Sequence, residues 1–263
     1  MQLRYIALVT GCDCLNLDKE FVYKFNFNQR FISNYLSKAI RRYHYETDGT
    51  YKMIGVEIDH NYVPNRRRPK QFMIINNALS IIVPVKQSDI DAYNHETSLI
   101  NRYEFYLSVL ERGYHLINDN YKEIPVDLLL SLHDEFRNNG YKNEWLFKRI
   151  RAKEYGLIIE FHCEFTTFDF RFILSAYNDC SKEMIAQDYI FRTGPDEVFY
   201  DYVFKKVQVE GDKLIVYGFI GTKSFIIDLP SLAKGQISVE YRKSEHLDYQ
   251  KDECTELINR ITW

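Results

Sequence analysis

The clearest alternation of apolar and polar residues in the chain runs from Gly156 to Leu174. Successive side chains of a strand point to opposite faces of its sheet, so this alternation predicts a β-hairpin that turns at Thr166-Thr167. One face of the predicted hairpin is apolar: Ile159, Phe161, Cys163, Phe165, Phe168, Phe170, Phe172 and Leu174. The other face is polar: Glu160, His162, Glu164, Asp169 and Arg171. In this register His162 lies opposite Arg171, and Glu164 lies opposite Asp169, a like-charge pair that a metal or a basic partner could relieve.

A second β unit follows the hairpin. Gly211-Asp212 has the glycine that a two-residue type II′ turn requires, and it places Val209 opposite Leu214. A turn over 221–224 then places Ile220 opposite Phe225, and a strand over 237–242 completes an antiparallel meander. The second face of this meander is unusually apolar for a surface and requires cover from the chain's helices or from a partner. Its apolar residues are Ile215, Tyr217, Phe219 and Ile226.

The first half of the chain mixes strands and helices. It predicts a strand over 3–10, a helix over 28–43 capped by Asn28, and a strand over 51–58. A hairpin then turns at Asn76-Asn77, two residues that tolerate the positive φ of tight turns.

Helical periodicity dominates the middle of the chain. Ser88 and Asp91 resemble a capping box at the start of a long helix that Gly113 ends. Further helices are predicted over 125–140, 144–151 and 245–261.

These elements predict an α+β fold. We expect an α+β N-terminal lobe over 1–117, a helical connector over 118–152, and an antiparallel β lobe with a C-terminal helix over 153–263.

Composition narrows the possible functions. The 263 residues include 21 Tyr and 18 Phe but only 2 Trp, which favours an aromatic β core and leaves a tyrosine-rich recognition surface as the alternative. A formal net charge of -3 argues against a general nucleic-acid binder. No stretch approaches the roughly 18 apolar residues of a membrane-spanning helix, so we expect no membrane association.

Cysteine usage bears on the compartment. Five scattered cysteines indicate a reducing compartment rather than a disulfide framework. Residues 9–12 resemble a bacterial lipobox, but the apolar stretch over 5–9 is shorter than the ~7–15 residues of a secretory segment. We therefore expect a cytoplasmic protein.

One group of residues has the composition of a catalytic site. Glu57 and Asp59 share a strand face, His60 follows, and the basic loop Arg66-Arg67-Arg68 comes next. Two carboxylates could hold a divalent metal while the arginines bind a phosphate, as in a metal-dependent phosphodiesterase or nuclease. However, the following strand at 72–75 lacks the acid-x-Lys of restriction-type nucleases, and a strand end that leads into a solvated basic loop has the same composition.

No nucleophile, phosphate-binding or zinc motif is present, so we predict no catalytic residues, no bound metal and no cofactor. The leading hypothesis is a non-enzymatic protein-binding protein, specifically an immunity-type protein that neutralises a bacterial toxin. Candidate contact residues are Glu160, His162, Glu164, Asp169, Arg171, Tyr217 and Phe219. A homo-oligomer that covers the same meander face with its own copy is a further possibility.

Overall fold

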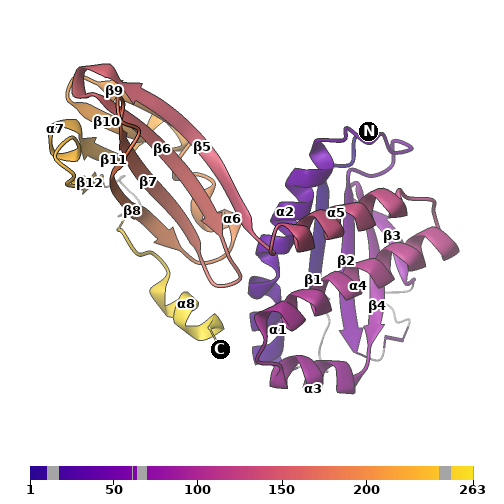
Figure 1. Ribbon diagram of the computed structural model, residues 1–263. Coiled ribbons are helices and arrows are strands. Elements are labelled where there is room, and N and C mark those ends of the chain that lie inside the picture. The colour runs from indigo at the N-terminus through magenta and orange to yellow at the C-terminus, as the bar shows by residue number, and fades with distance from the viewer. Residues whose placement is uncertain (11–17, 61, 64–69, 243–249, 263) are drawn as a thin grey trace. The chain divides into compact units, whose positions relative to one another are not determined.

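The computed structural model describes all residues except 11–17, 61, 64–69, 243–249 and 263, and leaves the side chain of Ile220 undescribed. The chain has the predicted α+β fold (Figure 1) and divides into two compact units, residues 1–143 and 144–263. The boundary between them falls inside the range 118–152, for which a connector was predicted.

The first unit contains a four-stranded sheet in the order β1-β2-β4-β3. The first three strands are parallel, and β3 runs antiparallel to β4. The strands are β1 (Tyr5–Thr10), β2 (Met53–His60), β3 (Phe72–Ile75) and β4 (Ala78–Val85). The helices are α1 (Lys19–Asn28), α2 (Arg30–Arg41), α3 (Gln87–His95), α4 (Leu99–Asn120) and α5 (Val126–Asn138).

Helices α4 and α5 cross one face of this sheet (Figure 1), where α4 packs on β2 and β4, and α5 packs on α2 and α4. Buried aromatic rings join the helices. The ring centroid of Phe31 in α2 lies 5.0 Å from that of Tyr103 in α4 and 5.8 Å from that of Phe136 in α5. Aromatic rings from several helices therefore pack together in the core of this unit, beside the aliphatic residues of the sheet.

The free edge of β1 is covered by polar side chains. In an edge strand every second N–H group points away from the sheet, and here three successive ones meet an acceptor on α1 or α2. The pairs are Ile6 N with Ser37 Oγ at 2.9 Å, Leu8 N with Ser33 Oγ at 3.3 Å, and Thr10 N with Asn26 Oδ1 at 2.8 Å. The three acceptors, Ser37, Ser33 and Asn26, lie on helices and follow helical spacing. The sequence pattern around them therefore gives no sign that they bind a strand edge.

Several helix boundaries differ from the predicted ones. Asn28 does not cap a helix but ends α1, a helix that the periodicity did not predict, and Gln29 precedes α2. The long helix is interrupted: α3 starts at Gln87, and Ser98 caps α4 by accepting a hydrogen bond from Asn101 N. By contrast, the turn at Asn76-Asn77 is confirmed, since both residues have positive φ.

Gly113 does not end α4, which continues to Asn120. Instead it lets the helix approach β2. A Cβ atom at this position would lie 2.7 Å from Val56 Cγ2 and 2.9 Å from Val56 Cγ1. The glycine is thus required by close packing rather than by a turn.

The second unit contains two antiparallel sheets, in the orders β5-β6-β7-β8 and β12-β11-β10-β9. The first consists of β5 (Asn143–Ala152), β6 (Leu157–Phe165), β7 (Phe170–Asn178) and β8 (Met184–Thr193). The second consists of β9 (Lys206–Glu210), β10 (Lys213–Tyr217), β11 (Lys223–Asp228) and β12 (Val239–Tyr241). Short helical turns are η1 (Lys153–Tyr155), α6 (Glu197–Tyr200), η2 (Phe219–Gly221) and α7 (Leu229–Leu232), and α8 (Thr255–Ile261) is the last helix.

The predicted helix over 144–151 is wrong, because these residues form β5. Alternate residues of β5 contact the aromatic core of the unit. The ring centroids of Trp145 and Phe170 lie 6.0 Å apart, and those of Phe147 and Phe172 lie 5.6 Å apart. Pairing with β6 and these contacts prevail over the local periodicity.

The β6–β7 hairpin forms, but its turn spans 166–169 rather than two residues. Phe165 therefore pairs with Phe170, and Phe161 pairs with Leu174. The shift equals two residues, so each strand keeps its predicted face. Phe168 and Asp169 are the exceptions: in the turn, Phe168 is half-exposed and Asp169 is buried.

The β9–β10 pairing is confirmed, with Val209 opposite Leu214. The next register is wrong: Val216, not Ile220, lies opposite Phe225, and residues 219–221 form η2. The second face of the meander was predicted to require cover. The chain itself buries Ile215 and Ile226 on this face, whereas Phe219 remains 61% exposed.

The last residues of the outer edge of β8 are covered by the C-terminal segment. Arg192 N donates to Lys251 O, and Glu253 N donates to Arg192 O, both at 2.7 Å. Tyr241 Oη covers a second point by donating to Ile190 O at 3.0 Å. Helix α8 is shorter than predicted, and Leu247 lies outside the described residues.

We predict that Gly113→Ala destabilises the protein by about 1–3 kcal/mol, the usual cost of overpacking a core. At an unhindered helical position, replacing glycine by alanine would instead stabilise the protein by up to ~1 kcal/mol. The sign of the change in unfolding free energy, measured in urea, therefore decides between the two cases. In a Val56→Ala background, which removes both clashing methyl groups, the penalty should vanish. A stabilising Gly113→Ala in the wild-type chain would contradict the packing role.

Candidate functional site

The outer face of the β5–β8 sheet carries most of the predicted contact residues. The strand register arranges its central part in three rows across β6, β7 and β8. The rows are Glu160–Ser175–Gln187, His162–Ile173–Tyr189 and Glu164–Arg171–Arg192. We call these nine residues the sheet face.

The third row continues onto the C-terminal segment, because Arg192 bridges to Asp252. Its charges run acid, base, base, acid. Arg171 Nη1 lies 3.5 Å from Glu164 Oε2, and Arg192 Nη1 lies 3.8 Å from Asp252 Oδ1. Two arginines directly opposite each other repel, so the row requires an anion between them.

Asp169 supplies that anion. Its Oδ2 accepts from Arg192 Nε at 2.6 Å and from Arg171 Nε at 3.0 Å, while Thr166 Oγ1 donates to Oδ1 at 2.8 Å. The side chain is only 1% exposed, and a buried carboxylate requires such charged partners. Asp169 therefore does not lie on the exposed face as predicted, but fixes the two arginines from beneath the turn.

The predicted cross-strand pairs are consequently wrong. Glu164 lies opposite Arg171, an attractive pair, and His162 lies opposite Ile173. His162 Nε2 instead contacts Glu160 Oε2 at 3.0 Å. No like-charge pair remains at Glu164 for a metal to relieve.

Tyr217 and Phe219 lie on the other sheet of the second unit, at the end of β10 and in η2. Tyr217 Oη donates to Glu210, and the Lys223 ammonium lies 5.9 Å from the centroid of the Tyr217 ring. Tyr217 is thus held by neighbouring side chains, whereas the Phe219 ring faces solvent. The seven predicted contact residues form two groups on two sheets.

The residues of the alternative nuclease hypothesis end β2. Glu57 and Asp59 are half-buried, and Glu57 Oε1 accepts from Ser80 Oγ at 3.1 Å. Arg66, Arg67 and Arg68 lie outside the described residues. Among the residues that are described, no three His, Cys, Asp or Glu side chains come close enough to hold a metal ion.

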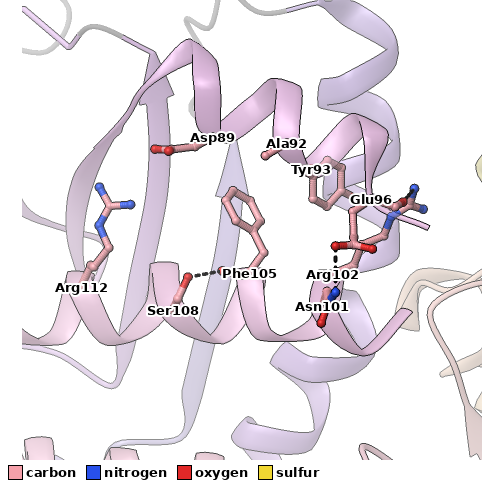
Figure 2. Close-up of a pocket in the computed structure, with 9 residues that line it drawn as sticks. All are labelled: Asp89, Ala92, Tyr93, Glu96, Asn101, Arg102, Phe105, Ser108 and Arg112. Atoms are coloured by element: carbon pink, nitrogen blue, oxygen red, sulfur yellow. Dashed lines mark hydrogen bonds between the residues drawn. The ribbon is translucent and has the colours of Figure 1, made fainter. Parts of the chain in front are cut away.

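A pocket of about 290 Å³ lies between α3 and α4 (Figure 2). It was not predicted from the sequence, because its lining residues come from two helices and form no recognisable sequence motif. Phe105 points into the space between the helices, with Asp89 and Arg112 on one side and Glu96, Asn101 and Arg102 on the other. The remaining lining residues are Ala92, Tyr93 and Ser108.

Two polar side chains of this pocket, Glu96 and Arg102, bond backbone groups where α3 ends and α4 begins. Glu96 accepts from Ser98 N at 2.7 Å and from Asn101 Nδ2 at 2.9 Å, and the first of these hydrogen bonds holds the pKa of Glu96 below its usual range. Arg102 donates to Glu96 O. Ser108 Oγ donates to Phe105 O in its own helix, so it is not activated by a base. Glu96, Arg102 and Ser108 thus all have hydrogen-bond partners within α3, α4 or the segment that joins them.

Comparison of the chain with models of protein families, with curated proteins and with solved structures finds no match. None of the described helices is long and apolar enough to cross a membrane. Functional inference therefore rests on the residues themselves.

We predict that Asp169→Asn lowers the free energy of unfolding by about 2 kcal/mol, because it leaves two opposed arginines without their shared anion. Asp201→Asn is a matched control, since Asp201 is 75% exposed and pairs with Lys205 on the surface. Its change should stay within about 0.5 kcal/mol. Similar small changes for both variants in urea unfolding would contradict the role of Asp169.

Proposed function

We propose that the protein is a non-enzymatic binder of another protein and that the sheet face carries the recognition. The observation that supports this most is the composition and rigidity of that face. It combines a tyrosine, a histidine, an isoleucine and two arginines with two glutamates, a glutamine and a buried serine. Tyrosine and arginine are residue types that interfaces favour.

Ion pairs hold this face in place before any partner arrives. Asp169 fixes both arginines, and Glu160 contacts both His162 and Arg149. Side chains that are already ordered lose less conformational entropy on binding, which raises affinity. The face is also electrically mixed, so its partner must match a pattern of charges rather than a single sign.

A specific version of this proposal is an immunity-type protein that neutralises a bacterial toxin in the cytoplasm. It is supported by the modest size, the net charge of -3 and the aromatic content of the chain. The same features would suit other protein partners, so the identity of the partner has to be measured.

The test is purification of the tagged protein from its own host, with mass spectrometry of the proteins retained at moderate salt. We expect one partner in stoichiometric amount, and His162→Ala/Tyr189→Ala should reduce its retention by about tenfold or more, since central interface residues each contribute ~1–2 kcal/mol.

His115→Ala/Tyr121→Ala is the control, because both residues are exposed on the first unit. Retention should not change in this variant. A bare protein, or a partner that both variants retain equally, would contradict the proposal.

A further inference from the structure

In the described part of the second unit, β5 has a long outer edge that no other strand of the unit pairs with. Strand β5 ends one sheet and β9 ends the other. At 10 residues, β5 is much longer than the terminal strands β9 and β12, with 5 and 3 residues. Strand β8 is as long, but the C-terminal segment and Tyr241 bond the end of its outer edge, at Ile190 and Arg192.

The inward side of this edge is aromatic and only half-covered. Trp145 and Phe147 are half-exposed although they touch the core. Phe147 lies 5.1 Å from Phe204, which precedes β9. Val209, on β9, is also exposed. Apolar side chains that alternate along an added strand would cover these residues.

The outward side of the same edge is basic in its second half, which carries Lys148, Arg149 and Arg151, all exposed. Its first half carries the exposed residues Glu144 and Leu146. Arg149 and Arg151 contact Glu160 and Asp179 through Nε, at 3.2 and 2.6 Å, and about 60% of each side chain remains exposed. Their Nη atoms can therefore still meet acidic groups of a ligand.

A pocket of about 350 Å³ lies where this edge ends. It is lined by residues 151–155 together with Val209 and Gly211. The space between the end of β5 and the β9–β10 turn could accept the side chain of a terminal ligand residue.

We propose that the edge of β5 binds an extended segment of a partner protein as an added strand, with apolar residues alternating with acidic ones. This deepens the proposed function and rests on it, since it specifies how a protein partner is bound. Backbone hydrogen bonds to β5 give affinity, while the aromatic and basic sides of the edge select the alternating pattern.

Basic residues on an edge strand hinder unspecific pairing. An acidic strand matches the positive charge of Lys148, Arg149 and Arg151.

The test uses a ten-residue peptide that alternates valine and glutamate, and a second peptide with the same residues in two blocks. Binding is followed by fluorescence anisotropy and by hydrogen exchange of the β5 amides in the full chain. We expect saturable binding of the alternating peptide, protection of alternate β5 amides, and much weaker binding of the block peptide.

Lys148→Gln/Arg151→Gln should weaken this binding about fivefold, as expected for two exposed ion pairs. Lys234→Gln/Arg242→Gln removes the same charge from exposed positions elsewhere in the unit and should have no effect. Equal binding of both peptides, or protection away from β5, would overturn the proposal.

Failure of this inference can be told apart from failure of the proposed function. A stoichiometric partner that depends on His162 and Tyr189 but not on Lys148 and Arg151 would reject strand addition at β5. It would leave the sheet face as the binding surface.

Discussion

The structure depends on how the backbone groups at the edges of its sheets are satisfied. An edge strand leaves every second N–H and C=O without a partner strand, and such groups either find other partners or attract another chain. In the first unit, Ser37, Ser33 and Asn26 take the N–H groups of β1. In the second, the C-terminal segment and Tyr241 Oη bond β8 at Arg192 and Ile190. Strand β5 ends the same sheet, and among the described strands of the unit none pairs with its outer edge, which motivates the proposed mode of binding.

The faces of the strands could be predicted from the sequence, whereas the turns and the edges could not. The strands of the β6–β7 hairpin keep their predicted faces because the observed pairing differs from the predicted one by two residues. A shift by an even number of residues leaves every side chain on the same face. The turn itself was mispredicted because Asp169 turns inward to meet Arg192, 23 positions away in the chain. No local pattern carries information about such a distant partner, and β5 was mistaken for a helix for the same reason.

Candidate contact residues show the same division. Glu160, His162, Glu164 and Arg171 do lie together on the outer side of β6 and β7. Residues from β8, including Tyr189 and Arg192, complete this face and were missed, since no strand was predicted over 184–193, where the pairing with β7 also contains a bulge near Ile190. Buried Asp169 turned out to organise the face rather than to belong to it. Polarity in alternate positions thus identified the face but not what holds it together.

Native-state hydrogen exchange of the free protein tests the edge account most directly. The amides of Ile6, Leu8, Thr10 and Arg192 belong to edge strands but have partners, so the account predicts slow exchange, close to that of the strand interiors. Alternate amides of β5 should exchange much faster. Fast exchange at Ile6, Leu8 and Thr10, or uniformly slow exchange along β5, would contradict the account.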